Sequence, residues 1–211
     1  MEYNKLIDNT LLKQDATKAE IKALCDESIK YNFKSCCINP CFIEFSKECL
    51  KNSNVLVCTV IGFPLGSMTS ESKVFETKDA IKKGADEIDM VINISRLKDH
   101  DDVYVENEIR EVKKACGEHV LKVIIECCLL TNEEKVRACL IAKDAGADFV
   151  KTSTGFSKWG AKVEDVKLMR ETVGPLMGVK AAGGVRTHEE LLEMVKNGAT
   201  RIGTSSGAKL M

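Results

Sequence analysis

The sequence predicts an α/β fold, a single-domain (β/α)8 (TIM) barrel that spans residues 1–211. Short, β-branched apolar runs alternate with stretches of helical period along the whole chain. The runs begin roughly 20–34 residues apart, which is the length of a strand followed by a crossover helix. The junctions Gly84-Ala85-Asp86, Gly146-Ala147-Asp148 and Gly198-Ala199-Thr200 each indicate a helix-ending glycine that leads directly into a strand.

Eight segments have the composition of buried strands, because they are short and rich in residues that favour a pleated sheet. They are residues 5–9, 35–39, 55–60, 86–92, 120–126, 148–152, 177–181 and 200–203. The first is the least regular of them, since it is short and half polar.

Helices are predicted between these strands. They cover residues 17–31, 70–83, 101–116 and 132–145, and a further helix opens at Thr187 and stops at Gly198. Thr17 and Thr187 each stand three residues before a glutamate, which is the pattern of a capping box. The helix over 70–83 is expected to begin at Ser70, with Lys73 where the acid of a capping box would stand.

Eight such units fit either a closed barrel or an open, doubly wound sheet. A Gly-x-Gly-x-x-Gly turn after the first strand, the best sign of a dinucleotide-binding sheet, does not occur. The strand count, the chain length and the glycine-rich turns late in the chain favour the barrel, near the lower size limit of that fold.

Composition excludes several classes of function. With 31 basic and 32 acidic side chains and no block of like charge, the chain lacks the footprint of a nucleic-acid-binding protein. No apolar run approaches the 18 or so residues of a membrane span, and the first residues have no signal-peptide core. We therefore expect a cytoplasmic protein with a small-molecule partner and with neither nucleic acid nor membrane as a partner.

The 10 cysteines are the unusual part of the composition. Two pairs are adjacent in sequence, no Cys-x-x-Cys occurs and the 3 histidines are scattered, so neither a disulfide framework nor a zinc site is favoured. We expect free thiols that pack as small apolar side chains in a reducing compartment.

Three charged residues fall where a barrel places its chemistry, inside strands or at their carboxyl ends. Asp89 lies within the apolar run 86–92, Lys151 ends the sixth strand, and Lys180 ends the seventh. Two nearby ammonium groups repel each other, which favours the neutral form of one, and a neutral lysine attacks carbonyls to form a Schiff base. The alternatives are a paired structural carboxylate at Asp89 and lysines that reach solvent from strand ends.

Two glycine-rich turns, at residues 182–186 and 203–207, follow the seventh and eighth strands. Barrels often hold a phosphate at this place, with backbone N–H groups and serine hydroxyls as donors. An ordinary strand-to-helix turn is the alternative. Together with the lysine pair, the turns predict a phosphate-handling barrel that performs carbonyl chemistry through an imine, as an aldolase does.

Five segments closely resemble the deoxyribose-phosphate aldolase family and occur in the order that the family has them. They are residues 7–12 (IDNTLL), 86–94 (DEIDMVINI), 150–156 (VKTSTGF), 179–186 (VKAAGGVR) and 201–206 (RIGTSS). The third and fourth segments, each of which begins with a valine and a lysine, form a highly specific pair.

The resemblance implies a class I aldolase without metal or cofactor, which reversibly cleaves 2-deoxy-D-ribose 5-phosphate into D-glyceraldehyde 3-phosphate and acetaldehyde in deoxyribose phosphate catabolism. By its motifs, Lys151 would form the Schiff base, Lys180 would favour the neutral form of that lysine, and Asp89 would transfer protons through a bound water. The residues that would bind the substrate and its phosphate are Thr154, Gly155, Gly183, Gly184, Arg186, Gly203, Ser205 and Ser206. A homodimer is compatible with this family, whose barrels often pair.

The chain departs from the family pattern at two points. Asn9 stands where the family usually has histidine, and the chain ends at Met211 without the tail that carries a tyrosine in some members. Cys37 matches a position where some members have a thiol near the site, although simple packing is the preferred interpretation. Lys122 and Glu126 share a face of the fifth strand by parity, and they are expected either to form a polar pair beneath the site or to lie outside it.

Three other functions are compatible with part of this pattern. Another Schiff-base aldolase could act on a different phosphorylated sugar, in which case acetaldehyde would not be a product. A silent sugar-phosphate-binding barrel is disfavoured because both lysines and Asp89 are intact. A metal-dependent isomerase is disfavoured because histidine, aspartate and glutamate ligands do not gather at strand ends.

Overall fold

The computed structural model describes residues 2–211, which form a closed barrel of parallel strands. Each strand hydrogen-bonds to the next in chain order, and β1 closes the ring against β8. The strands are β1 (Ile7–Leu11), β2 (Ser35–Ile38), β3 (Leu56–Ile61), β4 (Glu87–Val91), β5 (Val120–Ile124), β6 (Phe149–Lys151), β7 (Gly178–Ala182) and β8 (Arg201–Thr204). The predicted (β/α)8 barrel is therefore confirmed.

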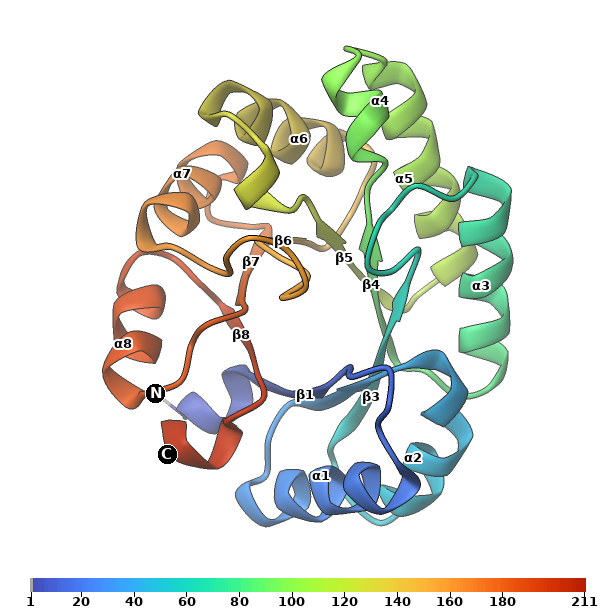
Figure 1. The fold of residues 1–211 in the computed structure, drawn as a ribbon, viewed down its shortest axis with the longest axis vertical. Coiled ribbons are helices and arrows are strands. Elements are labelled where there is room, and N and C mark those ends of the chain that lie inside the picture. The colour runs from blue at the N-terminus through green and yellow to red at the C-terminus, as the bar shows by residue number, and fades with distance from the viewer. Residues whose placement is uncertain (1) are drawn as a thin grey trace.

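Within residues 2–211, eight α-helices surround the strands, as the view down the barrel in Figure 1 shows. They are α1 (Lys18–Tyr31), α2 (Ile43–Cys49), α3 (Ser70–Lys82), α4 (Ile94–Lys98), α5 (Asp102–Cys116), α6 (Asn132–Asp144), α7 (Val163–Val173) and α8 (His188–Lys196). The described ends of the chain lie close to each other beside α8, where Tyr3 packs edge to face on His188 and His188 pairs with the carbonyl of Leu210.

All eight predicted strands are present, with bounds that differ by one or two residues. β1 begins at Ile7 rather than residue 5, because Tyr3–Leu6 form a 3-10 turn. β5 ends at Ile124 rather than residue 126, because the backbone of Glu126 turns into the left-handed region with a φ of 54°.

The predicted helices are also present, and α3 begins at Ser70 as expected, but its capping residue is not the expected one. Thr69 is its N-cap, and the Thr69 hydroxyl accepts from the N–H of Ser72 at 3.3 Å. Lys73 does not take part in the cap; it is buried and forms an ion pair with Glu108 of α5 at 2.7 Å. Helices α2, α4 and α7 were not predicted, and α2 and α7 begin without a capping side chain that would have marked them.

Alternate residues of each strand face the helices or the barrel interior. The main apolar core lies between strands and helices and includes Ile88 and Met90 of β4. Inside the barrel, a small apolar cluster of Leu12, Cys37, Cys58 and Val60 lies beside a set of buried charged side chains. The barrel interior is thus divided between a few apolar contacts and a charged network.

All ten cysteines carry free thiols, and eight of them are buried, as expected for cysteines that pack as small apolar side chains. Among residues 2–211, we find no helix with the length and apolar character that a membrane crossing requires.

Candidate active site

Lys151, Lys180 and Asp89 meet inside the barrel below its carboxyl end. Lys151 is the last residue of β6 and lies in register with Lys180 of β7. Asp89 reaches both from β4, and its Oδ2 accepts from Lys151 Nζ at 2.8 Å and from Lys180 Nζ at 2.7 Å. The two lysines that the sequence places on neighbouring strands therefore share one carboxylate oxygen.

A third lysine holds the other oxygen of this carboxylate. Lys122 of β5 lies in register with Asp89, and its Nζ is 2.8 Å from Asp89 Oδ1 and 2.6 Å from Glu87 Oε2. The thiol of Cys58 donates to the same Asp89 oxygen at 3.3 Å. Asp89 is therefore surrounded by donors, as a fully buried carboxylate must be if it is to stay charged.

Asp8 of β1 extends the network to the opposite wall of the barrel. Its Oδ2 lies 2.5 Å from Lys180 Nζ, and its Oδ1 accepts from the Ser35 hydroxyl at 2.7 Å and from Arg201 at 2.8 Å. The guanidinium of Arg201 also donates to both oxygens of Glu87, at 2.8 and 3.2 Å. Each of these charged groups therefore has at least one partner of opposite charge.

Neighbouring groups of opposite charge, rather than burial, determine which side chains of the network are charged. Burial would raise the pKa of Asp89, yet the ammonium groups of the three lysines hold that pKa well below its ordinary value. Burial would lower the pKa of Lys180, but Asp8 and Asp89 outweigh this effect and raise the pKa above its ordinary value. Asp89 and Lys180 are therefore both charged at neutral pH.

The charges inside the barrel do not balance when every group is ionised. The network contains the carboxylates of Asp8, Glu87 and Asp89 and the cationic side chains of Lys122, Lys151, Lys180 and Arg201. Three carboxylates therefore face four cationic side chains. Because an uncompensated charge is costly in a buried site, the network favours the loss of one proton from its cations.

Two groups of side chains in this region come close enough together to be considered as metal ligands. Cys37, Cys58 and Asp89 offer ligand atoms within 4.8 Å of one another, and so do Asp8, Cys58 and Glu87. However, both Asp89 oxygens already accept from ammonium groups, which would repel a metal ion. The surroundings of Asp89 therefore favour lysine ammonium groups over a metal ion as its partners.

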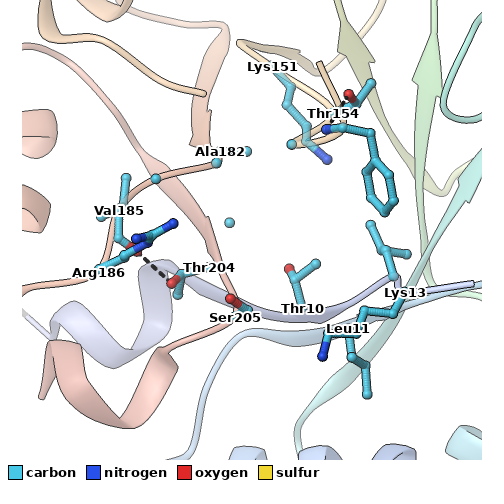
Figure 2. A pocket seen from close by; sticks show the side chains of 16 residues that line it. Thr10, Leu11, Lys13, Lys151, Thr154, Ala182, Val185, Arg186, Thr204 and Ser205 are labelled. Atoms are coloured by element: carbon cyan, nitrogen blue, oxygen red, sulfur yellow. Dashed lines mark hydrogen bonds between the residues drawn. The ribbon is translucent and has the colours of Figure 1, made fainter. Parts of the chain in front are cut away.

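A cavity of about 260 Å³ opens above the network at the carboxyl ends of the strands (Figure 2). Lys151 lines it, and so do Thr154, Gly155, Gly183, Gly184, Arg186, Gly203 and Ser205 from the predicted binding residues. In Figure 2, Lys151 and Thr154 stand on one side of the cavity and Arg186 on the other. Asp89 and Lys180 are fully buried and do not line the cavity.

Ser206 is the predicted binding residue that does not line the cavity. Its N–H donates to the hydroxyl of Thr204 at 3.0 Å, and that hydroxyl donates to the carbonyl of Val185 at 2.7 Å, the dashed contact in Figure 2. The turn after β8 is thereby tied to the turn after β7, so the two glycine-rich turns form one continuous wall.

Two glycines in this wall lie where a side chain would be unfavourable. Gly183 has a φ of +82°, which side chains rarely adopt, and a Cβ there would lie 3.0 Å from the Cα of Gly160. A Cβ at Gly203 would lie 3.0 Å from Lys180 Cε, so a glycine at this position leaves room for the Lys180 side chain. The glycines thus allow the backbone path of the wall and leave room for Lys180 behind it.

The two residues that depart from or vary within the family lie in different places. Asn9 faces away from the cavity, toward α1, where its amide donates to Glu27 at 2.8 Å and to Ser28 at 3.2 Å. Cys37 lies fully buried inside the barrel, and its hydrogen bond with Cys58 lowers the pKa of its thiol. The asparagine at position 9 therefore leaves the cavity wall unchanged.

Sequence reasoning did not place Glu87, Arg201 or Lys122 in the network. A signal for Glu87 was present, because it stands two residues before Asp89 and therefore points to the same side of β4. Of the two alternatives for Lys122 and Glu126, the polar pair does not form, and Lys122 points into the barrel and pairs with Glu87 and Asp89. The left-handed backbone of Glu126 takes its side chain out of the strand pattern, and its carboxylate binds Thr154 instead.

Comparison with known proteins identifies the family. A family model described as DeoC/LacD family aldolase matches residues 4–210. The deoxyribose-phosphate aldolase of Finegoldia magna is 62% identical over 211 residues, which cover 100% of this chain and 99% of that protein. The deoxyribose-phosphate aldolase of Clostridium perfringens is 64% identical over 203 residues, which cover 96% of this chain and 91% of that protein.

A solved structure agrees with this result. The tetrameric deoxyribose phosphate aldolase of Aeropyrum pernix matches with a TM-score of 0.90 and 33% identity, covering 99% of this chain and 88% of that chain. The family match covers nearly all of the chain. The chain therefore belongs to the DeoC/LacD family of aldolases.

Proposed function

We propose that this aldolase reversibly cleaves 2-deoxy-D-ribose 5-phosphate into D-glyceraldehyde 3-phosphate and acetaldehyde through a Schiff base on Lys151. One observation carries the proposal. Of the four cationic side chains in the network, only Lys151 lines the cavity, and its Nζ shares an oxygen of Asp89 with the charged Lys180. The shared name of the Finegoldia and Clostridium relatives supports the choice of substrate.

Imine formation begins with the neutral amine of Lys151, which attacks C1 of the open-chain sugar, and loss of water then gives an iminium. Lys180 keeps its proton, because Asp8 and Asp89 both hold its ammonium group. A fixed positive charge beside Lys151 favours the neutral amine there, and the interior charges then balance. The two lysines therefore have different roles in the proposed mechanism: Lys151 is the nucleophile, and Lys180 supplies the fixed positive charge.

Asp89 carries the proton in the next step. An iminium nitrogen bears fewer protons than an ammonium nitrogen, so Asp89 Oδ2, which accepts from Lys151 at 2.8 Å, becomes free to accept from a water. The C3 hydroxyl of the sugar loses its proton to this water–Asp89 relay, the C2–C3 bond breaks, and its electron pair enters the iminium to give an enamine. The enamine takes a proton at carbon, and hydrolysis releases acetaldehyde and Lys151.

The phosphate of the substrate is proposed to bind across the cavity from Lys151. Arg186 supplies a positive charge on that side, and the glycine-rich turns supply backbone N–H groups. The residues assigned to this role are Thr154, Gly155, Gly183, Gly184, Arg186, Gly203, Ser205 and Ser206. Their placement around one cavity, with Ser206 just behind its wall, supports the assignment.

The reaction as written uses side chains alone, and we propose that it needs neither metal nor cofactor. We further propose that the barrel works as a single domain in the cytoplasm, in deoxyribose phosphate catabolism, and that it assembles as a homodimer. The tetramer of the Aeropyrum pernix relative is another symmetric assembly, which light scattering at several protein concentrations would distinguish from a dimer.

Borohydride trapping tests the proposal. The protein is incubated with 2-deoxyribose 5-phosphate and borohydride, and the reduced adduct is located by mass spectrometry. We expect the adduct on Lys151 and its loss in Lys151→Arg. The adduct should be retained in Lys158→Arg, a matched change at an exposed lysine in the loop that follows β6. An adduct confined to another lysine, or turnover with no adduct, would overturn the mechanism. Turnover without acetaldehyde as a product would overturn the assignment of 2-deoxyribose 5-phosphate as the substrate.

A further inference from the structure

Glu126 is a buried carboxylate that the proposed reaction does not use. It follows β5, is only 2% exposed, and has a φ of 54° and a ψ of 66°, a left-handed conformation that is unfavourable for a residue with a side chain. Backbone strain of this kind persists where surrounding contacts hold it, and it is concentrated at functional sites. The contacts of Glu126 therefore indicate the function of its left-handed conformation.

The backbone on both sides of Glu126 is attached to the strand that ends in Lys151. The N–H of Ile125 donates to the carbonyl of Lys151 at 3.0 Å, and the N–H of Cys127 donates to the carbonyl of Thr152 at 2.8 Å. Glu126 lies between these two bonds. Its left-handed conformation allows both bonds to form while its side chain points toward Thr154.

The side chain of Glu126 is held mainly by donors from the turn after β6, and the thiol of Cys128 is a further donor to Oε1 at 3.8 Å. Both of its carboxylate oxygens accept from the N–H of Thr154 at 3.3 Å, and Oε2 also accepts from the Thr154 hydroxyl. That hydroxyl in turn accepts from the N–H of Phe156 at 3.0 Å. Among the described residues no lysine, arginine or histidine forms an ion pair with Glu126, in contrast to the three carboxylates of the barrel network.

This chain of contacts fixes the turn from Thr154 to Phe156. Thr154, Gly155 and Phe156 all line the cavity, and Figure 2 shows Thr154 on the side where Lys151 stands. Gly155 also lies against the opposite glycine-rich turn, since a Cβ at Gly183 would be 3.5 Å from the Gly155 Cα. Movement of the turn would therefore widen the part of the cavity between Gly155 and Gly183 and leave Lys151 on its strand in place.

We infer that Glu126 is a positioning residue that holds the Thr154–Phe156 turn in the geometry that recognises the phosphate of the substrate. The inference rests on the proposed function, because it assigns the phosphate to this cavity. It predicts that a defect at Glu126 weakens binding of the phosphate and leaves the chemistry at Lys151 intact.

The test compares Glu126→Gln with Glu133→Gln, the same change at an exposed carboxylate on the first turn of α6. Three quantities are measured: kcat/KM for 2-deoxyribose 5-phosphate, kcat/KM for unphosphorylated 2-deoxyribose, and the inhibition constant of inorganic phosphate. Loss of a charged acceptor is expected to reduce the preference for the phosphorylated sugar and to weaken phosphate inhibition by about tenfold each. Glu133→Gln should change neither quantity.

A second variant separates positioning from folding. Thr154→Val removes the hydroxyl that links Glu126 to Phe156 and should reduce the same two quantities, and the double variant should be no worse than the poorer single variant. If Glu126→Gln does not fold, Glu126→Asp, which keeps the charge but shortens the reach toward Thr154, is measured in its place and should weaken the same two quantities. An unchanged substrate preference, or an equal loss on both sugars, would overturn the inference. Failure of wild-type trapping at Lys151 would instead overturn the proposed function, and phosphate inhibition would still test Glu126.

Discussion

Replacement of Lys180 by methionine tests the charge argument most directly. The Lys180 side chain is fully buried, and its Nζ lies 2.5 Å from Asp8 and 2.7 Å from Asp89. Methionine removes the charge and keeps a flexible, unbranched side chain of similar length. Asp8 retains its contact with Arg201, and Asp89 retains two other lysines, so neither carboxylate is left without a cation.

The expected magnitude follows from the geometry that remains. In the variant, Lys151 is the only lysine on Asp89 Oδ2, and three cations balance three carboxylates with Lys151 protonated. Unit charges 4–5 Å apart at an effective dielectric of 20 interact by about 3–4 kcal/mol, which corresponds to a factor of about 10² to 10³. Imine formation at neutral pH should fall by about that factor and recover as the pH is raised, because the amine must lose its proton to react.

The assay is single-turnover borohydride trapping on Lys151 across the range from about pH 6 to pH 10. Lys78→Met, the same change at an exposed lysine of α3, is the control, and urea unfolding verifies that both variants are folded. A folded Lys180→Met protein that traps substrate at the wild-type rate at neutral pH would refute the reasoning. A loss that does not recover at high pH would show that Lys180 acts by something other than its charge.

Three further predictions concern stability. Lys73→Met should lower the free energy of unfolding by about 3–5 kcal/mol in urea, because it leaves the buried Glu108 without its cation; a loss below 1 kcal/mol would contradict this. The pKa of Asp8 is held below its ordinary value, since Lys180 and Arg201 outweigh burial, so its contribution to stability is complete above about pH 4 and is lost as the pH falls. Asp8→Asn should therefore flatten the acid side of the curve of stability against pH, and an unchanged slope would argue against the ion pair. Thr131→Ala removes the capping box of α6 and should cost about 1 kcal/mol, measured as a lower Tm; an unchanged Tm would show that packing alone holds this helix.

The fold could be predicted because its signals are local. The threonines at positions 17 and 187 form the capping boxes that the sequence indicated, and the apolar runs between the helices became strands. The N-cap of α3 was assigned to Ser70 instead of Thr69 because the two residues are adjacent and both can cap a helix, so only the path of the backbone decides between them. The end of β5 was misplaced because a left-handed glutamate carries no sequence signal.

The centre of the site could be predicted because charged residues are unusual within apolar strands. Its partners could not be predicted in the same way. Arg201 is the first residue of β8 and reaches Asp8 of β1, which lies 193 positions earlier in the chain. Only the closure of the barrel, in which β1 pairs with β8, brings these two strands together. A contact between residues so far apart in the chain leaves no periodic pattern in the sequence from which it could be predicted.

The closure of the barrel also explains why two lysines in register come to differ. Lys151 and Lys180 are paired across β6 and β7 and share Asp89, so neither the strands nor this carboxylate distinguishes them. The difference lies in Asp8, which contacts Lys180 and comes from β1 on the far side of β8. Asp8 holds the proton of Lys180, and in the proposed mechanism this fixed charge is what sets Lys180 apart from Lys151. In the proposed mechanism, the choice between the two lysines therefore depends on a residue of a strand that pairs with neither β6 nor β7 in the sheet.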